Sequence, residues 1–151
     1  MKNNEIKIRF METEDIPQVY EIEKRSFSIP WSEKSFLESI ALPHAIFLVA
    51  EDGKQILGYC GMYKVFGEGD ITNIAVLPEY RGMGVGTGLL KEMIGYASER
   101  GILDITLEVR ESNKGAIHLY RKFGFENVGI RKNFYEKPTE NAVIMWKRGR
   151  K

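Results

Sequence analysis

The sequence predicts a single mixed α/β domain, and three observations support this fold class. The chain has 151 residues, a common size for one domain, and no linker, internal repeat or low-complexity segment divides residues 1–151. Segments of alternating hydrophobicity are interleaved with segments of helical spacing, which predicts the order βααβββαβαββ. Within that order, a strand, a helix and a strand over residues 70–109 predict one parallel pair, because such crossovers are almost always right-handed.

The first part of the chain is expected to hold one strand, over residues 6–10, and two helices. Thr13 and Ser32 are the predicted N-caps, because short hydroxyl side chains satisfy free N–H groups at helix starts. The residues predicted to face inward are Ile16, Val19 and Tyr20 on the first helix, and Phe36, Leu37 and Ile40 on the second.

The middle of the chain predicts a hairpin followed by a strand, helix and strand. Residues 45–51 and 55–65 are typical of strands, and Asp52-Gly53 between them is a strong hairpin signal. After a turn at 67–69, a strand is expected over 70–77 and a helix over 85–100, with Gly101 as the residue just past its end. The next strand alternates apolar and polar residues, and its apolar positions are Leu103, Ile105, Leu107 and Val109.

The last part predicts one helix and two strands. The helix is expected to begin at Ser112 or Asn113 and to be stopped by Gly124. Strand-like segments follow at 125–130 and 142–146, with an exposed loop over 136–141.

A glycine-rich segment, Gly82, Gly84 and Gly86, joins the strand at 70–77 to the helix after it. Glycine leaves backbone N–H groups unobstructed, and the helix start adds partial positive charge, so the segment suits a pyrophosphate. Arg81 adds a forked cation beside it. From the loop alone, a glycine-rich turn without a ligand remains the alternative.

Two better-known phosphate loops do not match this segment. A Walker loop needs Gly-Lys-Ser/Thr, and no lysine follows Gly86. A dinucleotide fingerprint needs glycine or alanine where Thr87 and Leu89 stand. Nucleoside triphosphate and dinucleotide chemistry are therefore not expected.

Composition limits the partners and the compartment. With 28% charged residues and a formal net charge of +1, the chain has no nucleic-acid footprint, and the basic residues at 147–151 are expected to be solvated. The chain has a single cysteine, no apolar signal core and no apolar run of about 20 residues. These features predict a soluble, cytoplasmic protein with no membrane partner. The two histidines, His44 and His118, lack metal-ligand spacing, so no metal site is predicted.

The segment Arg81-x-x-Gly-x-Gly86 resembles the acyl-coenzyme A loop of the GCN5-related N-acetyltransferase (GNAT) superfamily. Five further stretches resemble the RimI-type ribosomal-protein-alanine N-acetyltransferases within it: Phe27-x-x-Pro30-Trp31-Ser32, Asn73-Ile-Ala-Val76, Leu107-Glu-Val-Arg110-x-Ser-Asn113, Leu119-Tyr-x-x-x-Gly-Phe125 and Arg131-x-Asn-x-Tyr135. This resemblance covers nearly the whole chain. It implies a single-domain GNAT fold, a mixed and mostly antiparallel sheet split between the strands at 70–77 and 103–109 and flanked by helices.

The resemblance also implies a reaction and its residues. Acetyl-CoA would be the co-substrate, with Glu108 as general base, Tyr120 as the proton donor to the departing thiolate, and a neutral amine as the nucleophile. The implied coenzyme-binding residues are Ile74, Ala75, Val76, Arg81, Gly82, Met83, Gly84, Val85, Gly86, Thr87 and Asn113. The implied substrate-binding residues are Pro30, Trp31, Arg131 and Tyr135.

Plainer interpretations stand beside these roles. Glu108 could be a solvated strand residue, Tyr120 a core residue and Asn113 only a helix cap. A ping-pong route through Cys60 is rejected, because this cysteine lies in an apolar strand pattern without a nearby histidine.

The predicted function is transfer of acetyl from acetyl-CoA to the N-terminal alanine of a small-subunit ribosomal protein, by direct attack of the amine. Two alternatives remain at this point: acetylation of another amine (a polyamine, a lysine or another protein N-terminus), and a non-catalytic acyl-CoA sensor. A sensor is disfavoured because mere binding has no use for Glu108 and Tyr120.

Overall fold

The computed structural model describes residues 6–149, and these residues contain the predicted elements in the predicted order. Along the chain the elements are β1 (Lys7–Phe10), the 3-10 turn η1 (Thr13–Asp15), α1 (Ile16–Ser26), α2 (Glu33–Ile40), β2 (Ala45–Asp52), β3 (Gln55–Val65), β4 (Glu68–Val76), the 3-10 turn η2 (Pro78–Tyr80), α3 (Val85–Glu99), β5 (Ile105–Arg110), α4 (Lys114–Lys122), β6 (Glu126–Tyr135) and β7 (Glu140–Lys147).

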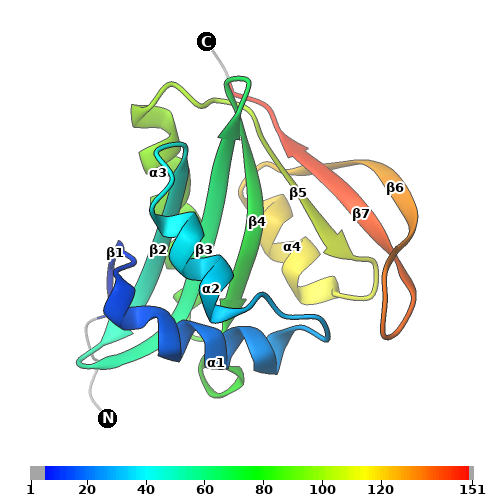
Figure 1. Ribbon diagram of the computed structural model, residues 1–151. Coiled ribbons are helices and arrows are strands. Elements are labelled where there is room, and N and C mark those ends of the chain that lie inside the picture. Colours follow the sequence, from blue (N-terminus) through cyan, green and yellow to red (C-terminus); the bar gives the residue numbers. More distant parts are fainter. Residues whose placement is uncertain (1–5, 150–151) are drawn as a thin grey trace.

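The seven strands form one sheet in the order β1-β2-β3-β4-β5-β7-β6. All neighbouring strands are antiparallel except β4 and β5, which are parallel as the crossover rule predicts. The parallel pairing extends only from Gly69 opposite Ile105 to Ile71 opposite Leu107. Beyond it the two strands diverge, and Figure 1 shows the opening between them. The prediction of a mixed, mostly antiparallel and split sheet is therefore confirmed.

The sheet has a hydrophobic core on each face, with two helices covering each of them (Figure 1). Alternate residues of β2 illustrate the division: Leu48 belongs to the core on the α3 and α4 face, whereas Val49 belongs to the core on the α1 and α2 face. This alternation follows from the period of two along a strand. The cleft described below therefore opens between two independently packed layers.

Several predicted helix ends are confirmed. Ser32 Oγ accepts a hydrogen bond from Ser35 N at 3.1 Å, and Asn113 Oδ1 accepts one from Ala116 N at 3.2 Å. Gly101 and Gly124 lie just past α3 and α4 with φ of 77° and 94°, a conformation that favours glycine.

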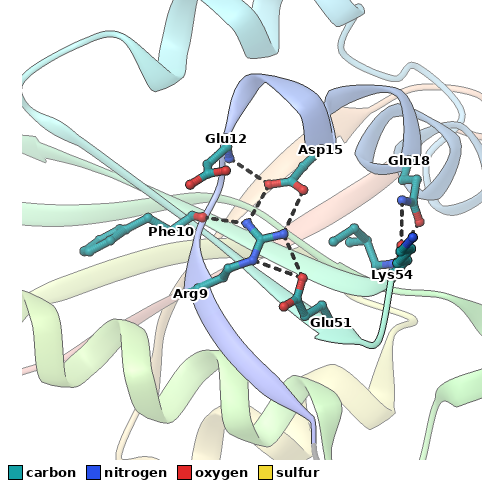
Figure 2. Close-up of polar contacts among 8 residues, drawn as sticks. Arg9, Phe10, Glu12, Asp15, Gln18, Glu51 and Lys54 are labelled. Carbon is teal, nitrogen blue, oxygen red and sulfur yellow. Dashed lines mark hydrogen bonds and ion pairs between the residues drawn. The ribbon is translucent and has the colours of Figure 1, made fainter.

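The predicted cap at Thr13 is wrong. Thr13 belongs to η1, and the carboxylate of Asp15 accepts the hydrogen bond from Glu12 N at 2.7 Å. The same carboxylate takes two bonds from the Arg9 guanidinium, at 2.8 and 2.9 Å, and Arg9 also binds Glu51 of β2 (Figure 2). Asp15 is thus held by tertiary contacts that local sequence does not contain.

Three predicted inward-facing residues also lie elsewhere. Leu37 and Leu103 are exposed, at 47% and 41%, and Tyr20 is only partly buried. β5 begins at Ile105 rather than at Leu103, and Ile102 is the buried residue before it. These three residues are exposed or only partly buried because the side of the helix or strand end that carries each of them does not pack against the sheet.

Candidate active site

A cleft of about 540 Å³ lies where β4 and β5 diverge. Its walls come from both faces of the sheet: α1 and the α1–α2 connection on one face, and α4 on the other. Predicted site residues that line it are Trp31, Ile74, Glu108, Asn113, Tyr120 and Tyr135. The opening therefore brings together residues that the sequence spreads over about a hundred positions.

The edge of β4 that faces this opening carries free backbone groups. The hydrogen bond from Leu77 N to Leu57 O, 2.8 Å long, makes these residues a bonded antiparallel pair with β3. Because bonded and non-bonded residues alternate, the N–H and C=O groups of Ile74 and Val76 point away from β3, toward the gap. One of these carbonyls, that of Val76, accepts a bond from Arg81 Nε at 3.1 Å. Ala75 is buried on the α1 face instead.

The glycine-rich loop follows β4 and leads into α3. Gly82 and Gly84 have φ of 81° and 88°, so glycine is required there by backbone conformation. A Cβ at either position would meet nothing within 4 Å, so the space beside this backbone is open next to the helix start. Gly86 and Thr87 lie in the first turn of α3, where N–H groups have no helical partner. Met83 and Arg81 are exposed, Val85 is buried, and residues 81–87 lie outside the lining of the cleft itself.

Glu108 lies on the floor of the cleft with a cationic partner. Its Oε2 accepts a hydrogen bond from Arg131 Nε of β6 at 2.7 Å, so two predicted site residues form an ion pair. Asp70 of β4 also lines the cleft and has no ion pair within residues 6–149. Burial, and next the charge of Glu108, raise the pKa of Asp70. The cleft therefore holds two neighbouring carboxyl groups, whereas the sequence analysis assigned one.

Tyr120 is buried in the core beneath α4 and lines the cleft from that side. Its ring lies 5.9 Å from that of Phe125, and burial raises the pKa of its hydroxyl. The nearby Cys60 is fully buried, and burial raises the pKa of its thiol to about 12. A thiol that stays protonated is a poor nucleophile, which agrees with rejection of the ping-pong route.

Aromatic side chains form the two walls of the cleft on the α1 face. Trp31 packs on Phe36 and Phe47, with ring centres 5.1 and 6.1 Å apart. Tyr135 stands on the opposite wall, and burial, followed by the charge of Glu108, raises the pKa of its hydroxyl to about 12. Pro30 precedes Trp31, is half-buried and lies outside the lining.

Sequence reasoning missed Glu23 of α1, a buried carboxyl that lines the cleft. It accepts hydrogen bonds from the Tyr59 hydroxyl and, at 2.9 Å, from Trp31 N. Burial raises its pKa, while bonds from Tyr59, Trp31 and Asn73 oppose that rise. A signal was available: Glu23 is four residues after Val19 and seven after Ile16, on the apolar face of its helix.

Between positions 6 and 149, no group of three or more His, Cys, Asp or Glu side chains is placed to hold a metal ion. In the same part of the chain, no helix is long and apolar enough to cross a bilayer.

Comparisons with known proteins agree with this geometry. Residues 16–125 match the Acetyltransferase (GNAT) family. A Bacillus subtilis (strain 168) protein, provisionally named [ribosomal protein bS18]-alanine N-acetyltransferase, is 45% identical over 140 residues, covering 92% of this chain and 93% of that protein. The [ribosomal protein bS18]-alanine N-acetyltransferase of Escherichia coli (strain K12) is 39% identical over 142 residues, covering 91% and 94%.

A solved structure extends the likeness to three dimensions. The crystal structure of the ribosomal-protein-S18-alanine N-acetyltransferase from Escherichia coli superposes with a TM-score of 0.89 at 34% identity, covering 97% of this chain and 96% of that one. The relatives and the solved structure match nearly the full length of the chain, and the family match covers residues 16–125. The chain belongs to the GNAT family of acetyltransferases.

Proposed function

We propose that this acetyltransferase transfers the acetyl group of acetyl-CoA to the N-terminal alanine of ribosomal protein bS18. The observation that carries the proposal is the cleft that passes through the sheet, with Glu108 on the α1 face and Tyr120 on the α4 face. Relatives whose names state this activity match more than nine-tenths of the chain. A ribosomal protein substrate supports a cytoplasmic location for this reaction.

The residues present fit the coenzyme. The open backbone at Gly82 and Gly84 and the first turn of α3 offer N–H groups for the pyrophosphate. The exposed Arg81 side chain offers a cation beside them. The free edge at Ile74 and Val76 can pair with an extended amide arm as an added strand does, and Asn113 lies beside it in the cleft. When bound, acetyl-CoA supplies a thioester-activated acetyl group, whose carbonyl oxygen the Val76 N–H would stabilise by about 3 kcal/mol.

Two carboxyl groups serve the acceptor amine. The α-ammonium must lose a proton before it attacks, and Glu108 takes this proton directly or through a water. Arg131 fixes the Glu108 carboxylate in one orientation by the 2.7 Å bond. Asp70 adds negative charge next to it, which attracts the incoming ammonium.

Tyr120 serves the departing sulfur. Because burial raises its pKa, its phenol is a weaker acid than a solvent-exposed tyrosine, and full transfer to a thiolate of pKa about 8.5 is uphill. Tyr120 therefore acts as a hydrogen-bond donor that stabilises the charge growing on sulfur. The second proton, which the attacking nitrogen loses as the amide forms, reaches the released thiolate through solvent.

An N-terminal amine suits this site better than a lysine amine. With pKa values of about 7.8 and 10.4, roughly 10–20% of α-amines but under about 0.1% of lysine amines are neutral at pH 7. The aromatic side chains of Trp31 and Tyr135 suit an extended peptide end with a small first side chain, because bulk next to the amine would collide with the strands on either side of the opening between β4 and β5.

The test compares three acceptors by mass spectrometry: a peptide with the bS18 N-terminal sequence, the same peptide blocked at its α-amine but carrying a free lysine, and spermidine. The unblocked peptide should be acetylated fastest, and Glu108→Gln should lower its kcat by about 10²- to 10⁴-fold. Faster acetylation of spermidine or of the lysine would refute the proposal in favour of another amine. Binding of acetyl-CoA without release of thiol would favour a sensor.

A further inference from the structure

Arg110 ends β5, two residues beyond Glu108 on the same side of that strand, and the reaction above gives it no role. Its side chain is largely buried, lines the cleft and lies against the Tyr135 ring, 4.6 Å from the ring centre. The guanidinium therefore lies in the cleft beside the Tyr135 wall, at the end of β5.

The Arg110 guanidinium bonds to two segments far apart in the sequence. Nη1 donates to Pro138 O at 3.0 Å and to Glu140 Oε1 at 3.1 Å, whereas Nη2 donates to Glu136 O at 2.9 Å and to Ser28 Oγ at 3.4 Å. Ser28 Oγ in turn donates to Glu136 O at 3.1 Å. One side chain thus joins the β6–β7 turn, residues 136–139, to the α1–α2 connection, residues 27–32.

Neither of these segments belongs to a strand or helix, so sheet pairing does not hold them together. Figure 1 shows the α1–α2 connection reaching across toward the β6–β7 hairpin at this end of the sheet. Glu140 adds a third attachment, because its Oε2 accepts a bond from Ser112 N at 2.6 Å just before α4. The planar fork of arginine suits such a junction, since it offers several donors in fixed directions.

We propose that Arg110 is a positioning residue that joins the two walls of the acceptor end of the cleft and so favours a peptide terminus over an internal lysine. A terminus needs one exit from the cleft, whereas a lysine within a chain needs room for backbone in both directions. Joining the walls across the end of β5 closes one of these directions. This inference rests on the proposed function, because it assigns the α1 side of the cleft to the peptide.

The kinetic test uses Arg110→Met, which keeps an aliphatic stem and removes all four hydrogen bonds. If the joined arrangement falls to about a tenth of the population, the KM for the alanine peptide should rise about tenfold. The preference for the α-amine over the blocked peptide's lysine should fall by a similar factor. The KM for acetyl-CoA and kcat at saturating peptide should change less than about twofold, since the coenzyme side is untouched.

Two further variants make the test specific. Ser28→Ala removes one attachment and should raise the peptide KM in the same direction but less, by about two- to threefold. Arg148→Met is the matched control: this arginine also lies over a ring, 4.2 Å from the Trp146 centre, and near a carboxylate, 3.8 Å from Asp104, but past the opposite end of β5. It should leave peptide KM and amine preference unchanged.

Hydrogen–deuterium exchange, which needs no substrate, separates this inference from the proposed function. Arg110→Met should speed amide exchange in residues 27–32 and 136–139 together. If wild type acetylates the peptide and Arg110→Met leaves peptide KM unchanged, the inference is overturned and the function stands, even if exchange rises. If wild type does not acetylate the peptide, the proposed function fails, and unchanged exchange in either segment would still overturn the junction.

Discussion

Replacing Tyr120 by phenylalanine tests the proposed donor to sulfur with little disturbance of packing. The residue is 5% exposed, and its ring packs on Phe125 within the core beneath α4. Phenylalanine keeps these ring contacts and removes only a hydroxyl that has no side-chain hydrogen bond within residues 6–149. The free energy of unfolding should therefore change by less than about 1 kcal/mol, the usual net value of one hydrogen bond.

The effect on catalysis should be much larger than the effect on stability. Because its pKa is raised, the Tyr120 hydroxyl remains protonated throughout the neutral range and is always available as a donor. Loss of one hydrogen-bond donor to charge that develops in the transition state costs about 10²- to 10³-fold, which corresponds to about 2.7–4 kcal/mol in the activation barrier. The decrease should appear equally in kcat and in kcat/KM, since charge reaches the sulfur only in the transition state.

The assay measures thiol release with the alanine peptide, beside calorimetric titration of acetyl-CoA and urea unfolding. Tyr96→Phe is the matched control, because Tyr96 of α3 packs on another ring, that of Phe10, at 4.8 Å and lies outside the cleft. A Tyr120→Phe enzyme with kcat within about threefold of wild type would remove this residue from the mechanism. A fall in kcat with an equally large loss in the free energy of unfolding would also remove Tyr120 from the mechanism, because disturbed packing would then explain the lower kcat.

Three further predictions concern the loop, the second carboxyl and the N-terminal ion pairs. Gly84→Val should abolish acetyl-CoA binding in calorimetric titration, because φ of 88° disfavours a β-branched residue and the side chain would fill the open space beside the loop backbone. Gly95→Ala, in an exposed turn of α3, should not change the affinity. Asp70→Asn should have a higher urea midpoint than wild type at pH 7 and the same midpoint near pH 3. Burial and the charge of Glu108 raise the pKa of Asp70 in the folded protein. The stabilising contribution of protonated Asp70 is therefore complete below the unfolded pKa of about 4 and is lost as pH rises through the folded pKa. Arg9→Met should cost about 2–3 kcal/mol at pH 7, less than a fully buried pair because Arg9 is partly exposed. Burial raises the pKa of Asp15, but the bonds from Arg9 and Glu12 N together with the Arg9 charge outweigh burial and lower this pKa. The wild-type advantage should therefore persist above about pH 4 and vanish as pH falls through the folded value. Equal urea midpoints for wild type and Arg9→Met at pH 7 would contradict the role given to this pair.

The sequence predicted the helix ends of the fold well where the interactions that decide them lie within a few residues. Ser32 caps α2 and Gly124 ends α4 through bonds and dihedral angles within a few residues. Thr13 was a wrong cap because Asp15, two residues later, is engaged by Arg9 from β1. Where a residue's partner lies on another element, pattern and propensity do not reveal it.

The same distinction explains which site residues the sequence could predict. The glycine loop is continuous along the chain, so its shape followed from its own residues, as the φ values of Gly82 and Gly84 show. Arg110 and Ser28, by contrast, are 82 positions apart, and no spacing rule relates them. Glu23 is intermediate: its place on an apolar helix face predicted burial, but its partners Tyr59 and Trp31 could not be named without the fold.

One extra residue in β4 connects the fold to the site. Opposite β3, Gly61 pairs with Asn73 and Met62 with Ile71, so Thr72 has no partner and forms a bulge. In a regular strand, residues 71 and 73 would share a face. Here Ile71 packs in the core beneath α3, whereas Asn73 is buried and bonds to Glu23 of α1 on the other face.

This bulge lies where pairing between β4 and β5 ends, just after Ile71. A bulge bends its strand and increases the local twist, so β4 turns away from β5 at that point. The residues beyond it, Ile74 and Val76, keep their pairing with β3 and carry their other backbone groups into the gap. The split of the sheet, the edge of β4 that faces the gap and the contact between Asn73 and Glu23 are therefore consequences of a single inserted residue.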